Sequence, residues 1–73
     1  MLFYIRGKLF GSYLNRVTPT WTTTKYYALR VDSFEAALDK ILALATSDPA
    51  IYDDIAGISD VQDRFYPLDE VLP

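Results

Sequence analysis

A chain of 73 residues without a single cysteine or histidine must fold around an apolar core alone. A domain this small buries only about 60% of the surface of its unfolded chain, and many such domains add disulfides or a structural metal. Disulfides and thiolate zinc sites are excluded here, and the commonest transition-metal ligand is missing. Because 51% of the residues are hydrophobic and 15% are aromatic, the sequence does supply a core. We therefore expect one domain spanning residues 1–73.

The same two absences limit the chemistry of the chain. Neither a Ser-His-Asp triad nor a Cys-His nucleophile pair can be built from this composition. Acid–base chemistry near pH 7 would need carboxylates, lysines or tyrosines with strongly shifted pKa values, and such shifts require deep burial. We therefore predict that the protein is not an enzyme and needs no cofactor.

Charge divides the chain into two unequal halves. Residues 1–31 contain five basic residues and no acid, a formal charge of +5, and they hold seven of the eleven aromatic side chains. Residues 32–73 contain ten acids against two basic residues, a formal charge of −8. The two halves either face each other within the fold and neutralise each other, or leave a bipolar surface suited to an electrostatic partner.

Alternation of apolar and polar residues predicts two strands in the basic half, over residues 2–14 and 21–31. Gly7 and Gly11 interrupt the first strand and indicate a bulge or a bend. Pro19 and its polar neighbours predict a loop between the strands. The simplest arrangement is an antiparallel hairpin.

Helical spacing begins where the basic half ends. Asp32 and Glu35 have the spacing of a capping box, and they are followed by an apolar stripe that would cover the sheet. The members of this stripe are Phe34, Leu38, Ile41, Leu42 and Ala45. A short second helix is predicted from Asp48, as its N-cap, and Pro49 to an end before Gly57.

The C-terminal segment predicts a third strand over residues 58–66, because a two-stranded sheet needs a further partner. Ser59 and Gln62 also have capping-box spacing, which leaves a short helix open as the alternative. Residues 67–73 should form an extended end unless their apolar side chains dock. The expected class is therefore α+β, with a hairpin, an amphipathic helix, a short second helix and a third strand.

Two sets of residues are candidates for binding. The acidic half offers carboxylates beside aromatic anchors, a combination suited to a basic protein surface, in Tyr52, Asp53, Asp54, Phe65 and Tyr66. The basic hairpin offers cations interleaved with aromatic rings, a combination suited to nucleic acid, in Tyr4, Arg6, Lys8, Phe10, Tyr26 and Arg30. The carboxylate pairs Asp53/Asp54 and Asp60/Asp63 lack the EF-hand pattern, so no metal site is predicted.

Together these features favour a small non-enzymatic module that binds a larger host protein or nucleoprotein complex. Acidic domains of this size are, by analogy, typical of virus- or plasmid-encoded inhibitors of nucleic-acid machines such as RNA polymerase or a CRISPR effector. Nucleic-acid binding through the basic hairpin and a homo-oligomeric structural subunit remain alternatives. Arg6 and Lys8 interrupt the apolar N-terminus, so we expect no secretory signal, no membrane partner and a cytoplasmic location.

Overall fold

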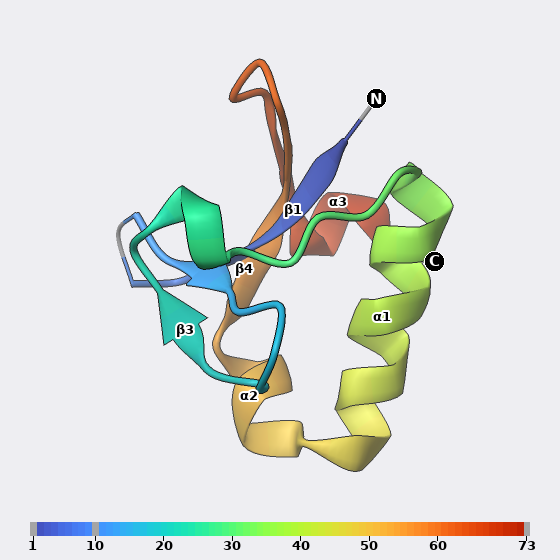
Figure 1. The fold of residues 1–73 in the computed structure, drawn as a ribbon. Coiled ribbons are helices and arrows are strands. Elements are labelled where there is room, and N and C mark those ends of the chain that lie inside the picture. Colours follow the sequence, from blue (N-terminus) through green and yellow to red (C-terminus); the bar gives the residue numbers. More distant parts are fainter. Residues whose placement is uncertain (1, 10, 73) are drawn as a thin grey trace.

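A computed structural model describes residues 2–9 and 11–72, and it confirms the α+β class. Five strands form one antiparallel sheet in the order β3-β2-β1-β4-β5 (Figure 1). The strands are β1 (Phe3–Gly7), β2 (Tyr13–Leu14), β3 (Trp21–Thr22), β4 (Ile55–Asp60) and β5 (Phe65–Pro67). The helices are the 3-10 helix η1 (Lys25–Tyr27) and the α-helices α1 (Phe34–Ser47), α2 (Pro49–Asp53) and α3 (Leu68–Val71).

The first predicted strand is in fact two strands joined by a tight reversal. β1 ends at Gly7, and the chain turns back so that Arg6 of β1 faces Tyr13 of β2. Gly11 has a φ of 76°, a conformation that favours glycine, and the Ser12 hydroxyl donates a 2.6 Å hydrogen bond to the Leu9 carbonyl oxygen. The bend expected at the glycines is therefore a full turn, and the first hairpin lies within residues 3–14.

The second predicted strand is wrong beyond Thr22. Of this segment only β3 (Trp21–Thr22) pairs with β2 as a strand. The chain then turns into η1 and returns to the sheet through single bridges at Ala28 and Val31. The Thr22 hydroxyl accepts a 3.1 Å hydrogen bond from the Thr24 amide. This local bond gives the backbone a hydrogen-bond partner other than a neighbouring strand. The segment therefore does not form a long strand, although it is rich in β-branched and aromatic residues.

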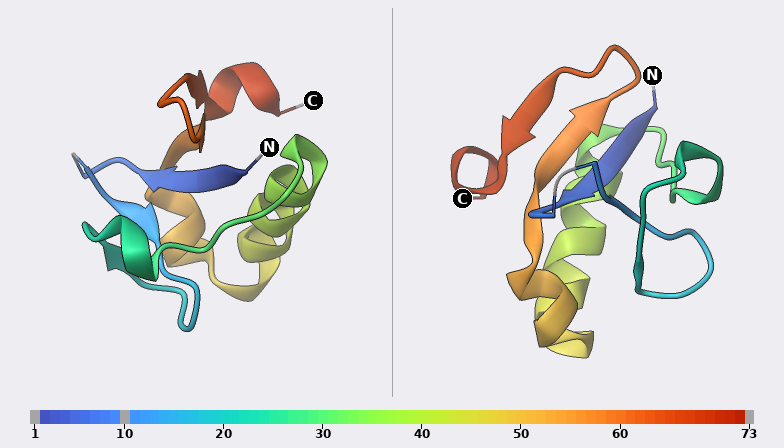
Figure 2. Two further views of the ribbon diagram at one scale, coloured as in Figure 1. Left: turned by 45° about the horizontal axis from the view of Figure 1, so that its top comes forward. Right: turned by 90° about the vertical axis from the view of Figure 1, so that its left-hand side faces the viewer.

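Helix α1 packs against one face of the sheet, as Figure 2 shows from two sides. Its first residue is Phe34, whose ring meets that of Phe3 edge to face with centroids 5.9 Å apart. The fully buried positions are Ala37, Ile41 and Leu44, so the predicted stripe is rotated and its Leu42 is exposed. Ile5, Leu14, Ile55 and Ile58 complete the core from the sheet side.

The N-cap of α1 is Ser33, not the predicted Asp32. The Ser33 hydroxyl accepts a 3.0 Å hydrogen bond from the Ala36 amide. Replacing Ser33 with alanine should therefore lower the free energy of unfolding by about 1 kcal/mol, whereas Asp32→Ala should change it by less than about 0.5 kcal/mol. Urea denaturation followed by circular dichroism measures both. A larger loss of stability for Asp32→Ala than for Ser33→Ala would instead indicate that Asp32 is the N-cap.

Helix α2 begins as predicted and ends earlier. The Asp48 carboxylate accepts from the Ile51 amide at 3.4 Å, and Pro49 occupies the first turn. The helix ends at Asp53, and Gly57 lies inside β4 instead of beyond a helix end. The chain enters the sheet immediately because Ile55 and Ile58 are both buried in the core.

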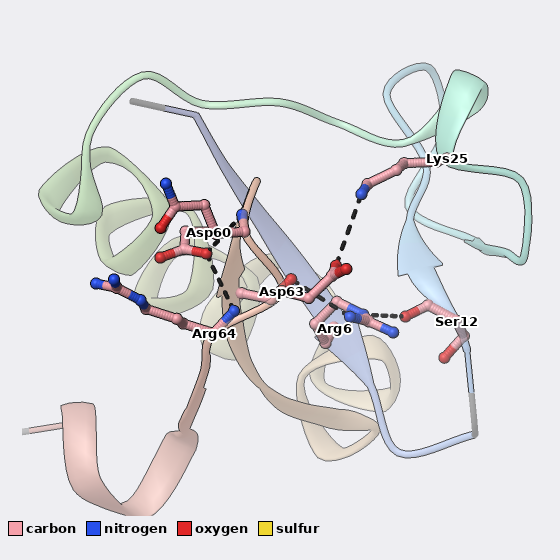
Figure 3. Close-up of polar contacts among 8 residues, drawn as sticks. Arg6, Ser12, Lys25, Asp60, Asp63 and Arg64 are labelled. Atoms are coloured by element: carbon pink, nitrogen blue, oxygen red, sulfur yellow. Dashed lines mark hydrogen bonds and ion pairs between the residues drawn. The ribbon is translucent and has the colours of Figure 1, made fainter.

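The predicted third strand is present as a hairpin of two strands. β4 pairs with β1 on one side and β5 on the other, which makes it a central strand. The turn between them is closed by the buried Asp60, whose Oδ1 accepts from the amides of Gln62 (2.8 Å) and Arg64 (3.0 Å) (Figure 3). Asp63 adopts a φ of 62° in this turn. The capping-box spacing of Ser59 and Gln62 therefore does not mark a helix.

The C-terminal segment folds back as α3 instead of extending. Leu68 and Val71 are partly buried and pack against the core cluster. Docking of these side chains supplies the energy that a four-residue helix lacks by itself. No helix in the described part of the chain is long and apolar enough to cross a membrane.

Candidate functional site

A groove of about 510 Å³ lies between α2, the start of β4 and α3, and we call it the α2–α3 groove. Its size falls within the range of known ligand sites. The lining residues are Lys8, Tyr52, Asp53, Ile55, Ala56, Leu68, Asp69 and Leu72. The groove thus has a mostly apolar lining, with two carboxylates and one ammonium group among it.

The groove exists because β5, the last strand of the sheet, is short. β5 pairs with Gly57, Ile58 and Ser59 and ends at Pro67, so in the described chain the first two residues of β4 have no strand beside them on that side. The chain then enters α3, which forms one wall. Tyr52 of α2 packs partly against the core and forms the opposite wall.

The charged groups of the groove form no ion pair within the described residues. The single ion pair among the described residues lies outside the groove and joins Lys25 and Asp63, with 3.6 Å between Nζ and Oδ1. Asp53 and Asp69 are exposed, as is Lys8. Because none of the three is ion-paired, all are available to charged groups of a ligand.

The predicted protein-binding residues do not all lie on one surface. Tyr52 and Asp53 line the α2–α3 groove. Asp54 lines a separate pocket of about 190 Å³ with Trp21, and its backbone carbonyl accepts from the Lys8 amide at 2.8 Å. Phe65 and Tyr66 are consecutive residues of β5, so their side chains point to opposite faces of the sheet.

Tyr66 faces α1, where its ring meets that of Phe34 edge to face at 5.5 Å. Phe65 is on the other face, which we call the open face, and it is 48% exposed. Of the five predicted residues, the structure therefore places two in the groove, one beside it, one on the open face and one against the helix.

On the open face, Arg6 is held by several groups at once (Figure 3). Its Nε donates to the Ser12 carbonyl oxygen at 3.1 Å, and one terminal nitrogen donates to the Ser59 hydroxyl at 3.4 Å. The guanidinium carbon also lies 4.1 Å from the centroid of the Tyr13 ring. Tyr4 is only 6% exposed, and Lys25 Nζ lies 5.2 Å from the centroid of its ring. A base therefore has little access to the Tyr4 ring.

The other members of the predicted nucleic-acid set are dispersed. Lys8 belongs to the α2–α3 groove, and Arg30 is exposed in the connection between η1 and α1. Tyr26 in η1 is 69% exposed, with the Arg16 guanidinium 5.3 Å from its ring centroid. Phe10 lies outside the described residues. Of the predicted set, Tyr4 and Arg6 lie together on the open face, where the rings of Tyr4 and Tyr13 meet edge to face with centroids 5.4 Å apart, whereas Lys8 lies in the groove.

The two members of each carboxylate pair, Asp60/Asp63 and Asp53/Asp54, have different surroundings. Asp60 is buried and closes the β4–β5 turn, while Asp63 pairs with Lys25 (Figure 3). Asp53 and Asp54 line different pockets. No group of three or more potential metal-binding side chains occurs among the described residues.

The residues that sequence analysis missed are those of the α3 wall, Leu68, Asp69 and Leu72. A signal was present, because Leu68, Val71 and Leu72 have the i, i+3, i+4 spacing of a helix face. Comparison of the chain with protein families, with curated proteins and with solved structures finds no match.

Proposed function

We propose that this protein is a small non-enzymatic module that docks onto a larger protein through the α2–α3 groove. The observation that carries the proposal is a mostly apolar groove of about 510 Å³ with two carboxylates that form no ion pair within the described chain. Apolar anchors entering such a groove leave water and supply affinity, while charges at its margin select the partner and speed the encounter.

The charge of the acidic half supports a more specific proposal. Asp53 and Asp54 at the end of α2, and Asp69 and Glu70 in α3, are all exposed. Such a surface suits the basic surfaces of nucleic-acid machines. We propose that the module acts stoichiometrically, as an inhibitor or regulator of a machine such as RNA polymerase or a CRISPR effector. That role, which rests on analogy, would place it in the cytoplasm.

Capture from lysate of the source organism tests the proposal. The immobilised protein, treated with nuclease and washed at moderate salt, should retain one stoichiometric complex identified by mass spectrometry. Tyr52→Ala, which removes a groove wall, should reduce recovery by about tenfold. Tyr26→Ala, which removes an exposed ring outside the groove, should leave recovery unchanged. Circular dichroism must first show that both variants are folded.

Other results of the same experiment would contradict docking through the groove. Equal recovery with the wild type and Tyr52→Ala would exclude the groove as the docking surface. Recovery that disappears with nuclease would favour nucleic-acid binding instead, and binding should then fall steeply with salt. Light scattering at two concentrations checks the homo-oligomer alternative, because a mass that stays at 8.3 kDa excludes it.

A further inference from the structure

The two carboxylates of the α2–α3 groove stand on opposite walls. Asp53 is the last residue of α2, and Asp69 lies in the first turn of α3. The apolar groups of Ile55, Ala56 and Leu72 contribute the rest of the lining. A ligand whose apolar side chains enter between the walls therefore meets a negative charge on each side.

The position of Asp53 does not stabilise its charge within the fold. A carboxylate at the C-terminal end of a helix faces the negative end of the helix dipole, which is unfavourable. Asp53 has no ion-pair partner among the described residues. The Asp53 carboxylate is thus free to pair with a cation that approaches from outside.

We infer that the α2–α3 groove binds a short amphipathic segment of the partner protein that carries apolar side chains flanked by lysine or arginine. This inference rests on the proposed function and names the chemistry of the docking segment. Apolar side chains of the segment would pack against Leu68 and Leu72. Its cations would pair with Asp53 and Asp69.

The charge of the groove also excludes competing ligands. An acidic segment would bring like charges against both carboxylates, which would repel it. Nucleic-acid phosphates would meet the same repulsion. Lys8 is the single cation of the lining, so it favours an acidic group or carboxylate at one end of the segment and gives the segment a direction.

Titration of the full chain with designed peptides tests this inference. The probes are a leucine/lysine peptide of about twelve residues with helical spacing, and a leucine/glutamate peptide of the same pattern. In amide NMR spectra at about 150 mM salt, the leucine/lysine peptide should shift the signals of Ala56, Leu68 and Leu72. The leucine/glutamate peptide should bind at least about tenfold more weakly.

Matched variants distinguish the effect of charge in the groove on peptide affinity from the effect of the net charge of the protein. The double variant Asp53→Lys, Asp69→Lys should weaken the leucine/lysine peptide by at least about tenfold. The control Asp32→Lys, Asp39→Lys changes the net charge by the same amount at exposed positions outside the groove lining, and it should change affinity by less than about twofold. Equal losses in the two variants, or shifts confined to the open face, would overturn the inference.

The partner complex distinguishes this inference from the proposed function. If the complex captured from lysate is lost with the Asp53→Lys, Asp69→Lys variant and kept with the Asp32→Lys, Asp39→Lys control, both the docking function and the basic chemistry of the segment are supported. If the complex is lost with Tyr52→Ala but kept with the double charge variant, the docking function stands and the basic chemistry of the segment is wrong.

Discussion

Replacing Gly57 with alanine is expected to lower the free energy of unfolding by about 3 kcal/mol. Gly57 lies in β4 between Arg6 of β1 and Pro67 of β5. A Cβ atom at this position would collide with the Tyr66 carbonyl oxygen and would lie 2.9 and 3.0 Å from two atoms of the Phe65 ring. The carbonyl oxygen belongs to the backbone of a paired strand, so it cannot move away without loosening β5.

This loss is large for so small a domain, whose total stability is about 4–11 kcal/mol at typical values per residue. It should appear in urea denaturation as a lower midpoint. Gly11→Ala provides the matched control, because a Cβ there meets no atom within 4 Å and the cost is only that of a φ of 76°, about 1 kcal/mol. If Gly57→Ala proved no more harmful than Gly11→Ala, the close approach of β5 to β4 would be wrong.

Because β5 leads directly into α3, the Gly57→Ala variant should also affect the α2–α3 groove. Loosening β5 would move the wall that carries Leu68 and Asp69. We therefore expect the amide signals of α3 to shift more than those of α2. Equal shifts in the two helices would indicate general unfolding instead of a local change.

Replacing Ile58 with alanine is expected to cost about 2–5 kcal/mol. Ile58 is fully buried in the interior strand β4, where it pairs with Ile5 of β1 on one side and Tyr66 of β5 on the other. It belongs to the single core cluster that α1 covers. Removing three carbon atoms there leaves a cavity that the neighbouring side chains, held in a paired sheet, fill only in part.

Two further substitutions calibrate the effect of Ile58→Ala. Ile58→Val should cost about 0.5–1.5 kcal/mol, and Leu42→Ala on the exposed side of α1 should cost less than about 1 kcal/mol. All three are measured by urea denaturation, with an unchanged m-value as the sign of a common unfolded state. A cost for Leu42→Ala equal to that of Ile58→Ala would support the predicted helix stripe over the observed one.

Predictions that depend on a few neighbouring residues succeeded best. The start of α2 follows from Asp48 and Pro49 alone, because capping and proline geometry act within one turn. The start of α1 was placed one residue early, because Asp32 and Ser33 are both good caps and only packing selects between them. Strand propensity failed over residues 23–31, where β2 offers only two residues to pair with.

The candidate site shows the same division. Tyr52 and Asp53, which line the groove, were already candidates from the sequence because an aromatic ring beside a carboxylate is a recognisable surface combination. Leu68 and Leu72 lie at least fifteen positions further along the chain and become neighbours of Tyr52 and Asp53 only when α3 folds back. Phe65 and Tyr66, adjacent in sequence, are instead separated by the alternation of side chains along β5.

Composition and local pattern determined the α+β class, the dependence on an apolar core and the acidic character of residues 32–73. The tertiary structure alone decided the order of the five strands, the position of β4 between β1 and β5, and the groove beside it. The physical reason is range: caps, turns and periodicity act over three or four residues. Pairing of β4 with β1 brings together residues about fifty positions apart in the sequence. This pairing is stabilised by the burial of apolar side chains from both segments, which neither segment can achieve alone.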